Sequence, residues 1–369
     1  MTNEEFMREA LGLAKKGMGF TSPNPMVGAV IVKKGEIIGS GYHKKYGDLH
    51  AERSAFAYCD ENRIDCRGAD MYVTLEPCCH YGKQPPCTEA IIEHGIKRVF
   101  IGSSDPNPLV AGKGVEILRD HGIEVTEGIL REECDALNEI FFHYITTGTP
   151  FVTMKYAMTL DGKIACYTGE SKWITGEAAR AHVQQERLRH SAIMVGIGTV
   201  LADDPLLTCR LENGRDPLRI ICDSSLRTPL DCNILKTARE VPTVIATISE
   251  DNEKAAMYER AGCRIIKTEP NDGHVDLSAL MKLLGRERLD SILLEGGGEL
   301  NWSALKEGIV SKVQAYIAPK LFGGSGKSPV AGQGVSLPAE AYMLEPCRIV
   351  RIGDDILIES RVKDVHGNN

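Results

Sequence analysis

Two spacings of apolar residues alternate along the first 145 positions. Residues 3–17 carry apolar side chains every three or four positions (Phe6, Ala10, Leu13 and Ala14), which predicts an amphipathic helix that ends at Gly17. Residues 27–32 and 37–42 flank the turn sequence KKGE and predict a β-hairpin. Helices and strands are then expected in alternation: helix 50–62, strand 71–75, helix 87–95, strand 97–102, helix 114–122, strand 123–128 and helix 131–145.

The alternation is interrupted at residues 146–150, TTGTP, and then resumes. We therefore expect two domains, at 1–146 and 147–369. A strand at 151–158 and a helix at 176–191 open the second domain, and a hairpin at 347–360 ends it. Further strands, several of them separated by helices, are expected at 192–198, 218–223, 241–247, 263–268 and 291–296. Strands and helices that alternate in both halves predict the α/β class.

The composition is that of a globular protein. Of 369 residues, 43% are hydrophobic and 25% are charged, and no apolar run approaches the roughly 18 residues that span a bilayer. The acidic start MTNEEFMREA does not have the pattern of a secretory signal. Twelve cysteines without an evenly spaced framework favour free thiols and metal ligands over disulfides, so we expect a cytoplasmic protein.

The charge favours a small-molecule substrate. The net charge is −8, the pI is about 5.8, and no dense Lys/Arg run is present. Proteins that hold a nucleic-acid backbone usually carry a basic face. We expect no nucleic-acid or membrane partner, and a homo-oligomer.

One short stretch, TLEPCCHYGKQPPC at 74–87, concentrates possible metal ligands. It contains Cys78 and Cys87, each directly after a proline, and it follows an upstream HAE with His50 and Glu52. A His-x-Glu before a Pro-Cys…Cys pair is the signature of zinc deaminases, in which one His and two Cys bind zinc and the Glu is not a ligand. The spacing here is C-x8-C, whereas the general signature is C-x2-C.

Three protein ligands leave one coordination position of zinc open, as a catalytic site requires. Zinc in such a site lowers the pKa of water from 15.7 to about 7. His50 and Cys87 are expected in the first turns of helices, where a thiolate is favoured. Glu52 would carry the proton. The alternative is a structural zinc with Cys79 or His80 as the fourth ligand, although Cys79 suits a small packing residue because it directly follows Cys78.

Several longer motifs resemble one family closely. TSPNPMVGAVIV, HAE, VTLEPC…PPCTEAI and SDPNPLVAGKG are similar to the N-terminal half of the bifunctional deaminase/reductase of riboflavin biosynthesis, in which C-x8-C is the rule. MTLDGKIA, GESKWIT, GIGTVLADDPLLTCR, LLEGGG and YIAPKLFGG are similar to its C-terminal half. The resemblance implies a cytidine-deaminase-like three-layer α/β/α domain with zinc, followed by a dihydrofolate-reductase-like α/β domain.

The resemblance also implies two reactions. The first removes the 2-amino group of 2,5-diamino-6-(5-phosphoribosylamino)pyrimidin-4-one by hydrolysis, and the second uses NADPH to reduce the ribosyl group to ribityl. By carry-over, the catalytic residue is Glu52, the zinc ligands are His50, Cys78 and Cys87, and the deaminase contacts its substrate through Asn24, His43, Lys83, Asp105 and Asn107. From the residues alone, Asn24 is equally well an ordinary turn asparagine and Lys83 a solvated lysine.

In the second half the residues alone are less informative. Residues 291–308 predict a strand, a glycine loop and a helix whose first N–H groups suit a phosphate, but the loop lacks G-x-G-x-x-G. The resemblance implies that NADPH is contacted by Ala157, Trp173, Thr199, Asp203, Ser224, Gly297, Gly298, Glu299, Leu300, Asn301, Trp302 and Ser303. It implies that the substrate is contacted by Lys155, Ser171, Arg187, Leu207, Arg210 and Glu295.

Some of these residues have other interpretations. Arg187 and Arg210 would clamp the ribose phosphate, but a solvated helix face is the default for Arg187. Trp173 would by default be a core residue. Lys155 and Glu295 are candidates for polarising or protonating the sugar oxygen. For the whole chain, the alternatives are a tRNA-type nucleic-acid deaminase with an accessory domain, and a non-enzymatic zinc module with a closed four-ligand site.

Overall fold

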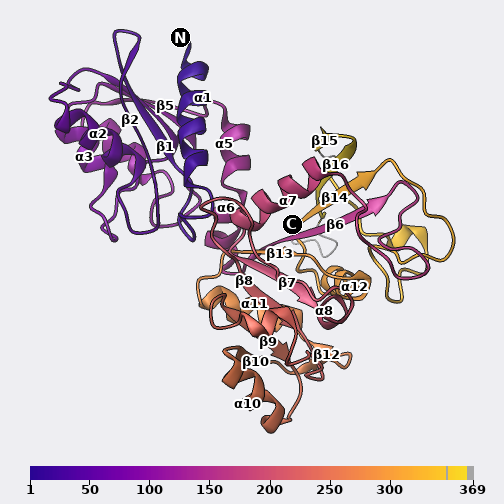
Figure 1. Cartoon of the computed structure of the whole chain (residues 1–369). Helices are drawn as coiled ribbons and strands as arrows, with labels where there is room; N and C mark the ends of the chain where they lie inside the picture. The colour runs from indigo at the N-terminus through magenta and orange to yellow at the C-terminus, as the bar shows by residue number, and fades with distance from the viewer. Residues whose placement is uncertain (346–347, 364–369) are drawn as a thin grey trace. The chain divides into compact units, whose positions relative to one another are not determined.

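A computed structural model describes residues 1–345 and 348–363 and separates the chain into two units, Met1–Gly148 and Thr149–Asn369 (Figure 1). The expected boundary after residue 146 falls just before this division. No helix in the described parts of the chain has the length and apolar character needed to cross a bilayer.

The first unit is built on one five-stranded sheet in the order β2-β1-β3-β4-β5. Its hairpin pairs β1 and β2 through a turn in which Lys34 and Gly35 both have positive φ, the backbone that two-residue hairpin turns favour. β1 also pairs antiparallel with β3, while β3, β4 and β5 are parallel. The strands are β1 (Gly28–Lys33), β2 (Glu36–Tyr42), β3 (Asp70–Leu75), β4 (Arg98–Ser103) and β5 (Glu124–Glu127).

Helices cover both faces of this sheet because its strands are apolar on both sides. Val30 and Tyr72 pack against α1 and α5, while Ile31 and Met71 pack against α2, α3 and α4. The result is the expected three-layer α/β/α domain. The helices are α1 (Asn3–Ala14), α2 (Ala51–Glu61), α3 (Cys87–Glu93), α4 (Lys113–Asp120), α5 (Arg131–Leu137) and α6 (Glu139–Thr147).

The second unit has a nine-stranded sheet in the order β10-β9-β8-β7-β13-β6-β14-β16-β15. The strands from β10 to β14 are parallel, and β16 and β15 close the sheet as an antiparallel hairpin. These strands are β6 (Phe151–Thr159), β7 (Ala192–Gly196), β8 (Leu218–Cys222), β9 (Thr243–Thr247), β10 (Arg264–Lys267), β13 (Ser291–Leu294), β14 (Lys312–Ala318), β15 (Arg348–Ile352) and β16 (Asp355–Arg361).

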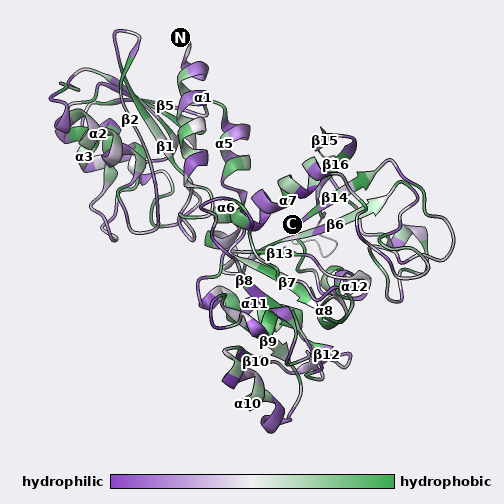
Figure 2. Ribbon diagram, in the orientation of Figure 1, coloured by the Kyte–Doolittle hydropathy of each residue, from purple (hydrophilic) through white to green (hydrophobic). Residues whose placement is uncertain are grey.

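Helices again lie on both faces of the sheet. Met194 and Leu294 face a core that includes α11 and α12, whereas Ile193 and Val195 face a core that includes α8, α9 and α10. The strands in the middle of the sheet are mostly green in Figure 2, as strands buried on both sides should be. The helices are α7 (Glu177–Arg189), α8 (Ile197–Asp203), α9 (Asn233–Lys236), α10 (Asn252–Ala261), α11 (Leu277–Arg286) and α12 (Gly298–Lys306).

Three elements differ from the sequence expectation. In place of the single helix expected at 131–145 there are two helices, α5 and α6, which meet at Asn138. The Asn138 side chain there bonds the N–H and the carbonyl of Met26, at 2.9 and 3.0 Å. The first helix ends at Ala14 and continues as a 3-10 turn to Gly17. Strand β14 was not predicted, and the expected last hairpin begins at Cys347, outside the described residues.

Candidate active sites

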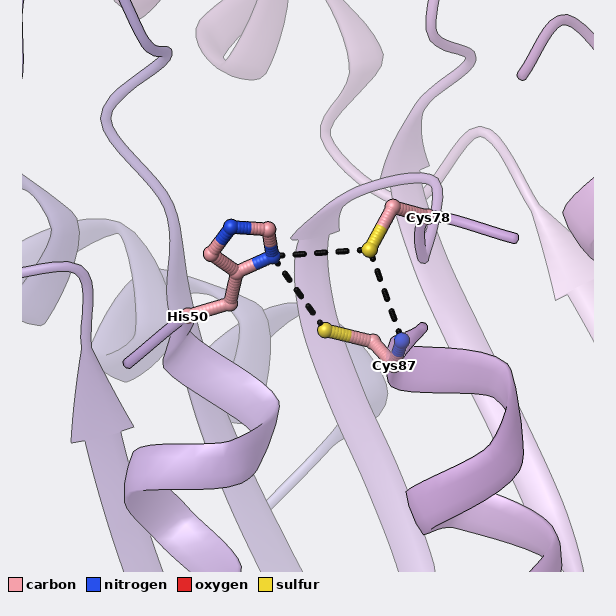
Figure 3. A group of neighbouring side chains, drawn as sticks. All are labelled: His50, Cys78 and Cys87. Atoms are coloured by element: carbon pink, nitrogen blue, oxygen red, sulfur yellow. Dashed lines mark hydrogen bonds between the residues drawn. The ribbon is translucent and has the colours of Figure 1, made fainter. Parts of the chain in front are cut away.

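The predicted zinc ligands lie together in the first unit (Figure 3). His50 Nδ1 is 3.4 Å from Cys78 Sγ and 3.5 Å from Cys87 Sγ, and all three ligand atoms lie within 4.8 Å of one another. His50 is the N-cap of α2, Cys87 is the first residue of α3, and Cys78 belongs to the segment that leaves β3. Segments far apart in the sequence therefore supply one site.

The segment before Cys87 is held by the helix that carries Glu52. Arg53 donates from Nε to the Pro85 carbonyl at 3.0 Å and from Nη2 to the Pro86 carbonyl at 2.7 Å. Because both carbonyls are fixed from α2, the end of the C-x8-C segment is held against the start of that helix.

The three residues fit a zinc ion by geometry. A nitrogen ligand at about 2.0–2.1 Å and a sulfur ligand at about 2.3 Å, at tetrahedral angles around one ion, stand about 3.5 Å apart. The two nitrogen–sulfur distances, 3.4 and 3.5 Å, match this value. Among the described residues, neither Cys79 nor His80 joins the group; the Cys79 thiol instead donates to the Leu109 carbonyl.

The electrostatics of the ligands also suit a cation. Hydrogen bonds from Cys87 and His50 outweigh burial and lower the pKa of Cys78 to about 4. The hydrogen bond to Cys78 raises the pKa of His50 against the effect of burial. The hydrogen bond to Cys78, and then burial, raise the pKa of Cys87 above its usual value. A divalent cation among the three atoms would compensate the charge of both thiolates.

Glu52 lies in the first turn of α2 and is 3% exposed. Its burial, and the negative charge of Cys78, raise the pKa of the carboxyl group above its usual value. A raised pKa favours the protonated form of the carboxyl group, which a group that delivers a proton must reach. Glu52 lies beside the ligand cluster, and its role as the proton carrier stays a prediction.

A cavity of about 300 Å³ joins the cluster to the predicted substrate contacts. Its walls come from the loop after α1, the segment after β2, the C-x8-C segment, the segment after β4, and α6. The predicted residues that line it are Asn24, His43, His50, Glu52, Cys78, Lys83, Asp105 and Asn107. All five predicted substrate contacts of the deaminase half thus share one cavity with Glu52.

The five side chains are held in different ways. Asn24 Nδ2 lies 3.3 Å from His43 Nε2, and His43 Nδ1 lies 3.0 Å from the Leu49 carbonyl. The His43 ring is therefore held between the Asn24 amide and the Leu49 backbone. The Lys83 ammonium stands 3.9 Å from the centre of the Tyr46 ring. Asn107 donates its backbone N–H to Asp105 at 2.8 Å. The Asn24 side chain thus contacts a second cavity residue, His43, which an ordinary turn asparagine would not do.

The sequence reasoning missed two contributors to this site. Phe141, Tyr144 and Ile145 of α6 line the cavity, although the expected single helix at 131–145 gave no sign of it. Glu76, a buried carboxylate at the end of β3, also lines the cavity. A charged residue directly after the apolar run of β3 was the available signal, since acidic side chains are rarely buried without partners.

In the second unit, Glu295 connects three elements. Arg187 of α7 donates from Nε and Nη2 to the two oxygens of Glu295 at 2.8 and 3.1 Å, and Lys155 Nζ of β6 lies 3.7 Å away. All three side chains are nearly buried, at 13–14% exposed. Burial alone would raise the pKa of Glu295, but Arg187 and Lys155 lower it to about 2, so the group is an anion at neutral pH.

This geometry bears on two interpretations. Arg187 is not on a solvated helix face, and its Nη1 also donates to the Thr208 carbonyl at 2.9 Å. An anionic Glu295 has no proton to donate, and a role of Lys155 toward the sugar oxygen stays a prediction. Thr208 lies next to Leu207 and near Arg210 in the chain. The backbone N–H of Arg210 donates to the Gln184 side chain of α7 at 2.9 Å. Ser171 lies in the loop between β6 and α7.

The predicted cofactor residues gather at the carboxyl ends of neighbouring parallel strands. Ala157 is in β6, Ser224 follows β8, Thr199 and Asp203 lie in α8 after β7, and residues 297–303 follow β13. A Cβ placed on Gly297 would stand 3.7 Å from Thr199 Oγ1, so the loops after β7 and β13 are adjacent. Ligands of open α/β sheets bind at such edges, where helix N-termini present free N–H groups.

The exposure of two predicted cofactor residues, Trp173 and Asn301, and of the predicted substrate contact Leu207 bears on their roles. Trp173 is 61% exposed, so the default of a core tryptophan is wrong, and Arg180 lies 4.7 Å from the centre of its ring. Asn301 is fully buried and donates its side-chain amide to the Pro329 carbonyl at 2.8 Å. Leu207 is 3% exposed. Asn301 and Leu207 therefore have almost no surface open to a ligand in this structure.

Comparison with known proteins gives a match for each unit. Residues 1–103 match the family described as the cytidine and deoxycytidylate deaminase zinc-binding region. Residues 150–358 match the RibD C-terminal domain.

Whole relatives match over nearly their full length. A riboflavin biosynthesis protein RibD of Actinobacillus pleuropneumoniae is 56% identical over 360 residues, covering 97% of this chain and 95% of the relative. That of Escherichia coli K12 is 38% identical and covers 97% and 99%. The solved structure of a Thermotoga maritima protein, a diaminohydroxyphosphoribosylaminopyrimidine deaminase/5-amino-6-(5-phosphoribosylamino)uracil reductase, is 40% identical with a TM-score of 0.85 over 98% of each chain.

Proposed function

Because the chain belongs to the RibD family of bifunctional riboflavin-pathway enzymes, with a deaminase and a reductase domain, we propose that its deaminase half depends on zinc and its reductase half on NADPH. The deaminase half converts 2,5-diamino-6-(5-phosphoribosylamino)pyrimidin-4-one to 5-amino-6-(5-phosphoribosylamino)uracil. The reductase half then reduces the ribosyl group to ribityl. A cytoplasmic homo-oligomer is part of this proposal.

In the deaminase half, His50, Cys78 and Cys87 would hold the metal. Zinc in such a site supplies a Lewis acid that makes water a nucleophile near neutral pH. Glu52 takes one proton from the attacking water and passes it to the ring nitrogen that loses its double bond to C2. It then moves the remaining hydroxyl proton to the 2-amino group, so that ammonia leaves as the carbonyl forms. Its burial keeps this proton from exchanging freely with solvent.

The cavity residues bind and orient the nucleotide. Asn24 and His43 lie side by side and can hydrogen-bond the edge of the pyrimidine. Asp105 and Asn107 face the same cavity and offer further polar partners. Lys83 is the cation at the exposed wall of the cavity and suits the ribose phosphate.

In the reductase half, hydride transfer chiefly requires that the cofactor and the sugar be positioned against each other. Residues at the carboxyl ends of β6, β7, β8 and β13 bind NADPH, with the phosphates near the start of α12. Glu295 holds Lys155 and Arg187, and Lys155 polarises the sugar oxygen. Arg210, which is exposed, suits the substrate phosphate better than Arg187, whose charge Glu295 compensates.

One observation carries the deaminase proposal: His50 and Cys78 of the three-ligand cluster line a single cavity together with Glu52 and the five polar residues. The experiment is metal analysis of the purified chain, with ammonia release measured from the diaminopyrimidine nucleotide. We expect about one zinc per chain and ammonia release without NADPH. Added NADPH, rather than NADH, should then be oxidised as the ribityl product forms.

The variant Glu52→Gln separates proton transfer from metal binding. The amide keeps the shape of the side chain but cannot accept the proton, and Glu52 is not a ligand. We expect zinc content unchanged, ammonia release lowered by a factor of about 10² or more, and reductase activity on supplied aminouracil retained. A Glu52→Gln chain that still releases ammonia at the wild-type rate would contradict the role of Glu52.

The alternative of a nucleic-acid deaminase is not favoured. Relatives that match 97% of the chain are riboflavin biosynthesis proteins, and the net charge of −8 opposes a polyanion. A binding assay with RNA at low salt should show no association.

A further inference from the structure

Glu76 is a buried carboxylate that lines the deaminase cavity but has no role in the mechanism proposed above. It lies between the last residue of β3 and the Pro77–Cys78 pair, and its side chain is buried, at 4% exposed. Its own N–H donates to the Ser103 carbonyl of β4 at 2.9 Å. The residue is therefore fixed to the sheet on one side and leads directly to a zinc ligand on the other.

The Glu76 side chain accepts four backbone N–H groups from one segment. Oε2 accepts from Asp105 at 3.3 Å and from Gly112 at 3.1 Å. Oε1 accepts from Gly114 at 3.1 Å and from Val115 at 3.4 Å. A carboxylate has about four acceptor positions, so these N–H groups occupy them all.

The segment that Glu76 gathers, residues 105–115, carries two of the proposed substrate contacts. Asp105 and Asn107 line the deaminase cavity. The segment is mostly loop, and apart from those to Glu76 its hydrogen bonds are largely internal, such as Asn107 N–H to Asp105 and Leu109 N–H to Asn107. Internal hydrogen bonds define the conformation of such a loop, but a contact with another part of the domain is needed to fix its position.

Sequence details agree with a close approach at this point. A Cβ on Gly114 would stand 2.3 Å from the Pro77 carbonyl oxygen and 3.2 Å from Glu76 Oε1, so only glycine allows α4 to begin here. Gly112, the N-cap of α4, has φ 81°, and the cap makes no side-chain hydrogen bond of its own. Glu76 supplies the acceptors that a capping side chain would otherwise provide at the start of α4.

We propose that Glu76 is the positioning residue that sets Asp105 and Asn107 against the zinc site, and thereby determines substrate affinity in the deaminase. The proposal rests on the proposed function, because it needs these two residues to contact the substrate. Glu76 itself has no acceptor position left for substrate, so it acts through the segment and not by contact.

The test is Glu76→Gln in the full chain. The amide nitrogen donates where an oxygen accepted, so two of the four N–H groups lose their partner while the side-chain volume is kept. We expect KM for the diaminopyrimidine nucleotide to rise about tenfold, equivalent to about 1.4 kcal/mol. We expect kcat to change less than KM, and zinc content and reductase activity on aminouracil to stay at the wild-type values. Hydrogen exchange should be faster at the amides of Gly112, Gly114 and Val115.

A matched control is Asp70→Asn. Asp70 is the first residue of β3, the strand that precedes Glu76. Its carboxylate accepts hydrogen bonds from Arg98 at 2.7 and 2.6 Å, away from the cavity. It should leave KM unchanged. A double-mutant cycle with Asp105→Ala adds a second check: the two changes should be less than additive in KM if they act through one segment.

The outcomes separate cleanly. A wild-type KM in Glu76→Gln, or additive effects with Asp105→Ala, would overturn the inference. If Glu76→Gln loses zinc, Glu76→Asp decides, since it keeps the charge but cannot reach all four N–H groups: a raised KM with zinc present supports positioning, and a wild-type KM refutes it. Failure of the proposed function is distinct, because the wild-type chain would then release no ammonia.

Discussion

Asp105 and Glu295 are both buried carboxylates, yet their pKa values move in opposite directions. Burial raises the pKa of Asp105 to about 6, against the N–H of Asn107, and the negative charges of Glu76 and Cys78 add to the rise. Burial acts the same way on Glu295, but the cations Arg187 and Lys155 overcome it and lower the pKa to about 2. At the scale of single residues, neighbouring charge decides which carboxylate is costly to keep ionised.

The raised pKa of Asp105 predicts a trade between stability and function. The folded state binds the Asp105 proton more tightly than the unfolded state does. The stabilising contribution of Asp105 to the free energy of unfolding is therefore complete below about pH 4 and is lost as pH rises through 6. A shift of about two units corresponds to at most about 3 kcal/mol. Asp105→Asn keeps the oxygen that Asn107 bonds, and should raise the melting temperature of the deaminase unit at pH 8 but not at pH 4.

The same variant should bind the substrate more weakly, so its KM should rise while its melting temperature rises. Thermal unfolding at the two pH values and ammonia release at pH 8 check both parts. A variant that is less stable than wild type at pH 8 would show that the carboxylate is not strained by burial.

For Glu295 the sign is reversed. Its contribution to stability is present above about pH 4.5 and is lost as pH falls toward 2. Glu295→Gln would leave the Arg187 and Lys155 cations buried together, which typically costs about 3–5 kcal/mol. We expect a clear fall in the melting temperature of the reductase unit at pH 7 and loss of reductase activity, with ammonia release unchanged.

A surface ion pair is the control for Glu295. Asp272 pairs with Lys306 where both side chains are more than half exposed, and Asp272→Asn should not change the reductase transition measurably. Equal effects of the two substitutions would contradict the view that burial makes the Glu295 cluster important.

At the scale of elements, both sites form where strands end. The C-x8-C segment leaves β3, and the Asp105 segment leaves β4, its parallel neighbour, so the two meet at one edge of the sheet. In the second unit, Lys155 in β6 and Glu295 after β13 come level because these strands are parallel neighbours with Leu294 opposite Met154. Parallel pairing places carboxyl ends together whatever lies between them in the sequence.

Helix breaks contribute as well. Asn138 ends α5 and bonds Met26, two residues beyond Asn24, while α6 begins directly after it and lines the cavity. The break that the apolar pattern of 131–145 did not reveal thus connects one wall of the deaminase cavity to another.

At the scale of the whole molecule, each unit has cores of its own. In the first unit Met71 and Val30 belong to cores on opposite faces of one sheet, and in the second unit Met194 and Ile193 do the same. The proposed zinc ligands all belong to the first unit, and the proposed cofactor residues to the second. The two activities should therefore respond separately to loss of either ligand.

Chelation tests this separation. Removing a ligand that binds only the folded state lowers the stability of the unit that holds it. We expect a zinc chelator to abolish ammonia release and lower the calorimetric transition of the deaminase unit, while the reductase transition and NADPH oxidation with aminouracil persist. Added zinc should restore the first transition. A chelator that lowers both transitions equally would indicate one cooperative unit.

The sequence by itself determined the α/β class, and it predicted the two halves and the ligand set His50, Cys78 and Cys87, because apolar spacing and short motifs are local properties of the chain. It also identified the family, because the motifs are long. Only the tertiary structure decided that Arg187 is buried against Glu295, that Trp173 is exposed, and that Glu76 collects the Asp105 segment. Those facts depend on which distant segments pack together, and burial and partner charge exist only after the chain has folded.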